Sequence, residues 1–164
     1  MKKIIVIGCP GSGKSYFSKI LSEKLNIKKY HLDLLFWKEN WTPTPRNEFI
    51  EIIKNILKED SFIIDGNYSS SLEIRFEKAD TIFFLDMPTE LCLASEKQRR
   101  GKKREDLPAY LEEVGEDKEF IEFIKSFSSN GRLKILSLIE KYSTKNIIIF
   151  KTRKEVNNYL ENIK

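Results

Sequence analysis

The chain has 164 residues, of which 40% are hydrophobic and 33% are charged, a balance typical of a folded globular domain and not of a disordered chain. Its net charge of +4 is modest, and its two cysteines are too few for a disulfide framework or a cysteine metal site. No apolar run approaches the roughly 20 residues that cross a bilayer, and the apolar run after Met1 is too short for a signal peptide. We therefore expect a single domain over residues 1–164 in a reducing cytoplasm.

Short strand-like runs alternate with helical patterns along the chain. In chain order the sequence predicts a strand at 3–7, a helix at 14–25, a strand at 28–32, a helix at 46–58, strands at 61–64 and 81–85, a helix at 89–100, a strand at 147–150 and a helix at 154–163. This alternation predicts a three-layer α/β fold with a parallel sheet and right-handed crossovers. Ligands of such folds lie beyond the carboxyl ends of the strands.

Residues 101–130 interrupt the alternation. This stretch is charged, contains Pro108 and Gly115, and has no strand-like run. We interpret it as a lid of loops and short helices inserted into the domain.

A glycine-rich loop follows the first predicted strand and opens the first predicted helix. Residues 8–15 match the pattern G-x-x-x-x-G-K-[ST] at every fixed position. The glycines let backbone amides face phosphates, and the helix adds its positive amino-terminal end. Lys14 is expected to reach the β- and γ-phosphates of a nucleotide, and Ser15 is expected to hold Mg²⁺. The residues predicted to contact the nucleotide here are Gly8, Pro10, Gly11, Ser12, Gly13, Lys14, Ser15 and Tyr16.

Two acidic residues follow predicted strands close to this loop. Asp33 follows the second strand, where a carboxylate can orient an acceptor hydroxyl and take its proton; a helix cap is the alternative. Asp65 ends the third strand, where it can hold Mg²⁺ through water, and Asp65 and the turn after it, with Gly66 and Tyr68, are expected to contact the substrate. Asp86, at the end of the fourth strand, is the alternative metal residue.

Aromatic residues come directly after Asp33. Phe36, Trp37 and Trp41 are candidates for the wall of an acceptor pocket or for stacking on a base, and equally for core packing. The sequence leaves both interpretations open. His31, inside the short second strand, is interpreted as structural.

Six of the eight residues from 97 to 104 are cationic, which favours a phosphate partner. Arg99, Arg100 and Arg104 are the predicted catalytic arginines, because phosphoryl transfer requires positive charge of fixed geometry on the migrating group. A solvated basic helix end is the alternative for each of them. Arg153 follows the last strand and is expected near the adenine, and Arg132 is a further candidate.

Together these motifs resemble the bacterial DNA topology modulation proteins, which belong to the adenylate-kinase-like group of P-loop kinases. The resemblance covers most of the chain. It is carried by the glycine-rich loop, the HLD run at 31–33, Trp37, the DGNY run at 65–68, the LDMP run at 85–88 and the TRKEV run at 152–156.

The resemblance implies a P-loop NTPase fold with strand order 2-3-1-4-5, and ATP and Mg²⁺ as cofactors. It places Arg99 and Arg100 among phosphate-clamping arginines and Arg153 near the adenine loop. One departure is that the Asp-Gly turn continues Asn-Tyr, where adenylate kinases have Phe-Pro-Arg. Arg75 is the candidate substitute for the missing acceptor-binding arginine, while Asp33 resembles the carboxylate of shikimate- and gluconate-type kinases, whose acceptors are hydroxyl groups.

These features favour an ATP·Mg²⁺-dependent kinase for a hydroxylated metabolite, nucleoside or nucleotide. Its expected partners are a nucleoside triphosphate and a small acceptor, with no membrane. The alternative is a nucleotide-binding regulator of DNA topology, which the basic cluster permits, although no helix-turn-helix, zinc site or repeated aromatic–basic pattern is present in the sequence.

Overall fold

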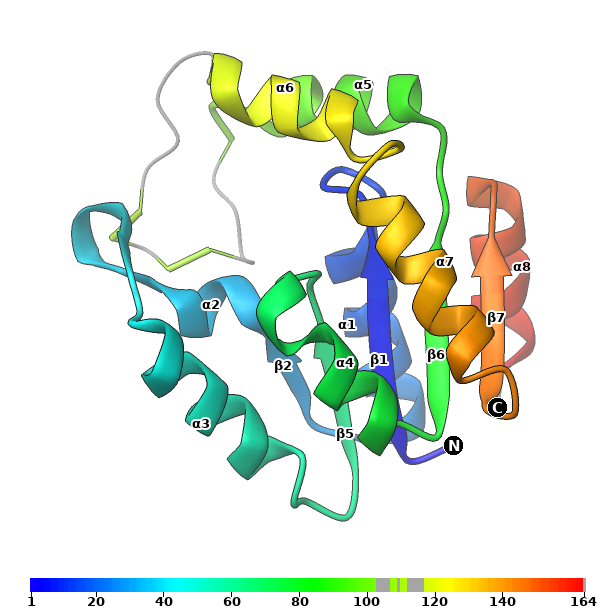
Figure 1. Ribbon diagram of the computed structural model, residues 1–164. Coiled ribbons are helices and arrows are strands. Elements are labelled where there is room, and N and C mark those ends of the chain that lie inside the picture. The colour runs from blue at the N-terminus through cyan, green and yellow to red at the C-terminus, as the bar shows by residue number, and fades with distance from the viewer. Residues whose placement is uncertain (103–106, 109, 112–116, 164) are drawn as a thin grey trace.

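A parallel sheet of five strands forms the centre of the molecule (Figure 1). The computed structural model describes residues 1–102, 107–108, 110–111 and 117–163. The strands of the sheet are β1 (Lys3–Gly8), β2 (Lys29–His31), β5 (Phe62–Asp65), β6 (Thr81–Leu85) and β7 (Asn146–Phe150). They lie in the order β2-β5-β1-β6-β7, which is 2-3-1-4-5 when these five are counted along the chain. The predicted fold class and strand order are therefore confirmed.

Helices cover both faces of the sheet and the carboxyl ends of its strands (Figure 1). One face carries α1 (Lys14–Leu25) and α8 (Arg153–Asn162), and the other carries α3 (Arg46–Ile56), α4 (Ser69–Lys78) and α7 (Gly131–Lys141). Above the strand ends lie α5 (Thr89–Arg99) and α6 (Lys118–Ser126). The short helix α2 (Leu32–Phe36) leads into a hairpin of β3 (Trp37–Lys38) and β4 (Thr42–Pro43), joined by a 3-10 turn at Glu39–Trp41.

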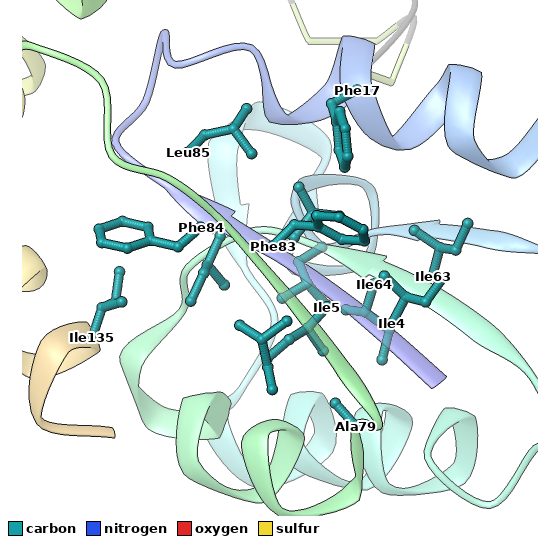
Figure 2. Packing of buried hydrophobic residues seen from close by; sticks show 14 of the residues in the cluster. Ile4, Ile5, Phe17, Ile63, Ile64, Ala79, Phe83, Phe84, Leu85 and Ile135 are labelled. Atoms are coloured by element: carbon teal, nitrogen blue, oxygen red, sulfur yellow. The ribbon is translucent and has the colours of Figure 1, made fainter. Parts of the chain in front are cut away.

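The central strands are apolar throughout because both faces of the sheet are covered. Phe83 of β6 packs edge-on against Phe17 of α1, with ring centroids 4.9 Å apart. The next residue, Phe84, points to the opposite face toward Ile135 of α7 (Figure 2). All of these side chains are almost fully buried.

The register of the parallel strands brings the functional segments to one edge of the sheet. Gly8, at the end of β1, pairs with Leu85, and Asp65, at the end of β5, pairs with Val6 on one side and His31 on the other. The glycine-rich loop, the turn after Asp65 and the segment after β2 therefore start from adjacent strand ends.

The architecture differs from the expectation in several places, including the unpredicted helix α2 and the β3–β4 hairpin. The second strand ends at His31, because Leu32 turns into the core as the first residue of α2. Helices α4 and α7 were not predicted: α4 opens with three serines and α7 with a glycine, residues that favour turns when considered alone.

Within the described residues, no helix is long and apolar enough to cross a membrane.

The packing of β6 yields a stability prediction. Phe83→Ala is expected to lower the free energy of unfolding by about 3–5 kcal/mol, because it leaves a cavity between β6 and α1. Urea denaturation followed by circular dichroism measures the change. Ile149→Ala, at a side chain that is 41% exposed, is the control and should cost much less; equal losses would contradict the packing described.

Candidate functional site

The glycine-rich loop has a backbone that side chains would disturb. Gly11 and Gly13 have φ angles of 80° and 97°, in the left-handed region that favours glycine. A Cβ atom on Gly11 would lie 2.3 Å from the carbonyl oxygen of Cys92. The loop is also held from behind, since the Asn67 side chain accepts from the Gly8 amide (3.0 Å) and donates to the Gly8 carbonyl (2.6 Å). The loop is thus fixed in one shape.

Lys14 lies within this loop and is not directed to solvent. Its Nζ donates to the carbonyl of Cys9 at 2.9 Å. Burial lowers the pKa of Lys14, while the negative charges of Asp33 and Asp65 act against that shift. A cation held between the loop and two carboxylates is well placed to meet an anionic phosphate chain.

A cavity of about 1570 Å³ lies against the loop, beyond the carboxyl ends of the strands. Ligand pockets are commonly about 300–1,000 Å³, so there is room for a nucleotide and a second molecule. Its wall includes the loop, the segment after β2, the turn after β5, and parts of α5, α6 and α7. The predicted site residues that line it are Pro10, Gly11, Gly13, Lys14, Ser15, Tyr16, Asp33, Trp37, Gly66, Tyr68, Arg99 and Arg153.

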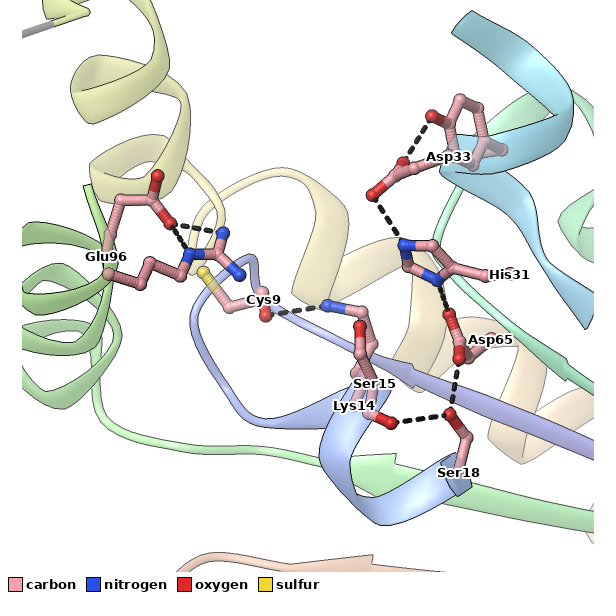
Figure 3. A network of polar contacts seen from close by, with 10 residues as sticks. Cys9, Lys14, Ser15, Ser18, His31, Asp33, Asp65 and Glu96 are labelled. Carbon is pink, nitrogen blue, oxygen red and sulfur yellow. Dashed lines mark hydrogen bonds and ion pairs between the residues drawn. The ribbon is translucent and has the colours of Figure 1, made fainter. Parts of the chain in front are cut away.

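A chain of polar contacts runs from the loop helix to the second strand (Figure 3). Ser18 donates to one oxygen of Asp65, and the other oxygen of Asp65 contacts Nδ1 of His31. Nε2 of His31 lies 3.3 Å from an oxygen of Asp33. The Tyr68 hydroxyl donates to the second oxygen of Asp33 at 2.5 Å. His31 therefore bridges the two acidic residues that the sequence singled out.

The surroundings of this chain set its protonation states. Burial alone would lower the pKa of His31, but its contacts with Asp33 and Asp65 outweigh burial and raise the pKa to about 9. Burial alone would raise the pKa of Asp33, but His31, Tyr68 and Lys14 hold it below its usual range. The raised pKa of His31 and the lowered pKa of Asp33 favour an ion pair between the imidazolium and the Asp33 carboxylate.

Two residues of this network were not identified as functional from the sequence. His31 was interpreted as structural; its 5% exposure fits that view, but its contacts place it at the centre of the site. Ser18 was not singled out. Ser18 could have been identified from its position one helical turn after Ser15, on the same face of α1.

Several predicted site residues do not line the cavity. Gly8 and Ser12 belong to the loop but are buried, Ser12 completely, and neither lines the cavity. Asp65 is also fully buried, with both oxygens occupied by His31 and Ser18, so the expectation of direct substrate contact is corrected. A role toward Mg²⁺ through water or through Ser18 stays a prediction. Arg104 lies outside the described residues.

Arg75 was predicted to bind the acceptor, and its position argues against that role. The side chain is fully buried and donates to the backbone carbonyls of Gly66 and Asn67. It therefore holds the turn after β5 from behind. The direction of α4, which the sequence did not reveal, turns Arg75 away from the cavity.

Asp86, the alternative metal residue, is engaged elsewhere. Its two oxygens accept from Nε and Nη2 of Arg132 at 2.7 and 2.9 Å. Both residues line a separate cavity of about 300 Å³. Arg132, the further candidate for the phosphate site, is therefore paired with Asp86 and does not line the large cavity beside the glycine-rich loop.

One buried carboxylate lies close to the two arginines at the end of α5. Glu96 is 2% exposed and pairs with Arg99, while Nε of Arg100 lies 3.7 Å from it. Arg99 lines the cavity and Arg100 does not. At the first residue of α8, Arg153 donates to the Gly11 carbonyl (3.2 Å) and to the Ser95 hydroxyl (2.9 Å), beside the glycine-rich loop; its expected position near the adenine stays a prediction.

The chain is similar to known proteins in sequence. A family model described as an AAA domain matches residues 4–119. A cytidylate kinase from Sulfolobus acidocaldarius is 47% identical over 64 residues, covering 38% of this chain and 32% of the relative. An adenylate kinase from Mesomycoplasma hyopneumoniae is 28% identical over 123 residues, covering 60% of this chain and 58% of the relative. The chain therefore spans less than two thirds of the length of these relatives.

The likeness in structure extends further along the chain. A shikimate kinase from Acinetobacter baumannii, solved in complex with shikimate, superposes with a TM-score of 0.66 at 11% identity. The match covers 99% of this chain and 90% of that one. At so low an identity the likeness shows the fold alone, and it is the P-loop fold expected from the sequence.

The bridging imidazole makes stability depend on pH. The raised pKa of His31 contributes stability that is complete below pH 6.5 and is lost as the pH rises through about 9. His31→Gln should therefore be less stable than the wild type by about 3 kcal/mol in mildly acidic buffer, and the difference should shrink in alkaline buffer. Urea denaturation across pH measures this difference.

His31→Asn is the matched comparison, because its shorter amide reaches toward Asp65 while that of glutamine reaches toward Asp33. Both variants lose the titrating imidazole, so both should lose the pH dependence. A wild-type advantage that stayed constant from acidic to alkaline buffer would contradict the ionised bridge.

Proposed function

The chain belongs to the AAA domain family, and we propose that it is an adenylate-kinase-like small-molecule kinase. It transfers the γ-phosphoryl group of ATP to a hydroxyl group of a small acceptor, with Mg²⁺. The observation that carries this proposal is the shared cavity: Lys14 of the phosphate loop and Asp33 line the same space. The sequence relatives named above are nucleotide kinases, which supports a phosphotransferase.

The residues of the loop fit a nucleotide bound through its phosphates. The left-handed glycines leave no Cβ between the loop and a ligand, and Lys14 brings a partly buried cation. Ser15, at the start of α1, would hold Mg²⁺, with Asp65 acting from behind through Ser18 or water. When bound, the metal neutralises charge on the phosphates.

Asp33 is the proposed base. Tyr68 and His31 each occupy one of its oxygens and leave further lone pairs for an acceptor hydroxyl. Both contacts fix the direction of the carboxylate and keep it ionised, which lets it orient the hydroxyl and accept its proton as transfer proceeds.

Arg99 and Arg153 supply positive charge near the transferring group and near the nucleotide. Both line the cavity, Arg99 from α5 and Arg153 from α8. We retain Arg100 and Arg104 in the proposal as further arginines for the phosphates. In related systems one such arginine raises the rate by about three to five orders of magnitude.

The proposal has finer parts that rest on the sequence motifs. They are a single domain over 1–164, a lid over about 101–130, and membership among the topology modulation proteins. Leu107 and Phe120, from the described part of that stretch, line the cavity, which supports a lid. The alternative of a DNA-directed regulator is not retained, because the sequence relatives named above are nucleotide kinases.

A phosphoryl-transfer screen with ATP·Mg²⁺ against nucleosides, nucleotides and polyols tests the function, and two variants test the residues. Lys14→Ala should lower kcat/KM by at least about a hundredfold, because it removes charge from the phosphates. Asp33→Asn should reduce turnover to a similar degree while calorimetry shows ATP binding largely intact. Undiminished turnover in Asp33→Asn would remove the assigned base.

Tyr68→Phe is the matched control for Asp33, since it deletes one hydrogen bond and keeps the carboxylate. It should lose less activity than Asp33→Asn. If calorimetry at millimolar nucleotide detected no binding to the folded wild-type protein, the proposed function would be wrong as a whole.

A further inference from the structure

The end of the cavity around Asp33 is walled by aromatic rings. Phe36, Trp37, Trp41 and Tyr68 all line it. Ring centroids lie 4.7 Å apart for Phe36 and Tyr68, 4.8 Å for Phe36 and Trp37, and 5.5 Å for Trp37 and Trp41. The wall therefore begins at the tyrosine that contacts the base and continues outward to Trp41.

The outer part of this wall is not core. Trp41 is 38% exposed and stands on the small hairpin formed by β3 and β4. Its φ angle of 52°, next to Asn40 at 55°, lies in the left-handed region, which costs a residue with a side chain about 1 kcal/mol or more. Core packing does not account for a strained, partly exposed indole at the mouth of a cavity.

The described arginines leave this end of the cavity without a phosphate clamp. Only Arg99 and Arg153, among the described arginines, line the cavity, and Arg153 is tied to the nucleotide loop. Arg75 is buried behind the turn. Lys134 lines the cavity and donates to the Ser69 carbonyl at 3.1 Å, but an ammonium acts on phosphate as a point charge and not as a bidentate fork.

We infer, resting on the proposed function, that the acceptor is a nucleoside: a planar ring lies against Trp37 and Trp41 while a sugar hydroxyl meets Asp33. Stacking on aromatic side chains suits any base, since every base offers a π-face. In the reaction the acceptor oxygen forms a bond to the γ-phosphorus, and the bond from that phosphorus to the bridging oxygen of ADP breaks. The hydroxyl proton passes to Asp33.

The first arm of the test compares acceptor classes with ATP·Mg²⁺ and the wild-type protein. Nucleosides should exceed ringless polyols and nucleoside monophosphates by at least about tenfold in kcat/KM. A preference for polyols or monophosphates would overturn the inference and leave the kinase standing. Transfer to none of the three classes would remove the proposed function, and the inference with it.

The second arm uses the chain's own fluorescence. The chain has two tryptophans, Trp37 and Trp41, and both line the cavity, so its indole emission reports on this wall. Titration of the wild type with uridine or adenosine should give saturable quenching, and glycerol should give none. No quenching by either nucleoside would contradict the stacking.

Variants of Trp41 connect the two arms. Trp41→Ala should raise the KM for a nucleoside about 5- to 150-fold, the equivalent of one stacked base, with the KM for ATP little changed. Trp41→Phe keeps a ring and should restore most of the loss, and Leu133→Ala, at an exposed side chain outside the cavity, is the control for surface truncation. If Trp41→Ala does not fold, fluorescence quenching by nucleosides in the wild type and in Trp41→Phe still tests the stacking. If Trp41→Ala folds and its KM for the nucleoside equals that of the wild type, the inference is overturned.

Discussion

The contact of His31 with two carboxylates is the interaction on which the rest of the site depends. Asp65 is fully buried and the side chain of Asp33 is 35% exposed, so carboxylates without a partner here would carry a desolvation cost, which is largest for Asp65. The imidazolium between them compensates both. It also links the loop helix, through Ser18 and Asp65, to the short helix α2 that carries Asp33. One side chain thereby connects the nucleotide end of the cavity to the acceptor end.

The turn after β5 extends this connection to the backbone. Asn67 binds both polar groups of Gly8 and so holds the start of the phosphate loop, while Tyr68 holds Asp33. Behind them Arg75 occupies the turn's own carbonyls, which would otherwise be buried without donors. A single turn therefore sets the separation between the glycine-rich loop and the carboxylate of Asp33, the proposed base. Reaction geometry of this kind tolerates errors of only about an ångström.

The sequence predicted those parts of the site that depend on local pattern. The loop at 8–15, the helix after it and the strands on either side follow from residue types at short spacing, and the structure confirms these elements. The role of His31 could not be predicted in this way, because it depends on the pairing of His31 with Asp65 across two strands. The misassignment of Arg75 has a similar cause, since the direction of α4 comes from its packing against the sheet. The pairing of Glu96 with Arg99 joins residues one helical turn apart, yet its importance lies in the burial of Glu96.

The acceptor end is where the chain departs from a kinase that selects a phosphorylated acceptor. The turn after Asp65 is the place where the adenylate-kinase pattern has an arginine for the acceptor phosphate. Here the turn carries two other side chains with separate roles, since Asn67 fixes the phosphate loop and Tyr68 orients the base. The nearby arginine, Arg75, is used for structure and lies out of reach of the cavity. Among the described arginines, Arg99 and Arg153 line the cavity, and Arg153 is bound to the phosphate loop, while a carboxylate and aromatic rings line the cavity around Asp33. An anionic acceptor group would meet Asp33 there at an electrostatic cost, whereas a neutral hydroxyl donates a hydrogen bond to it.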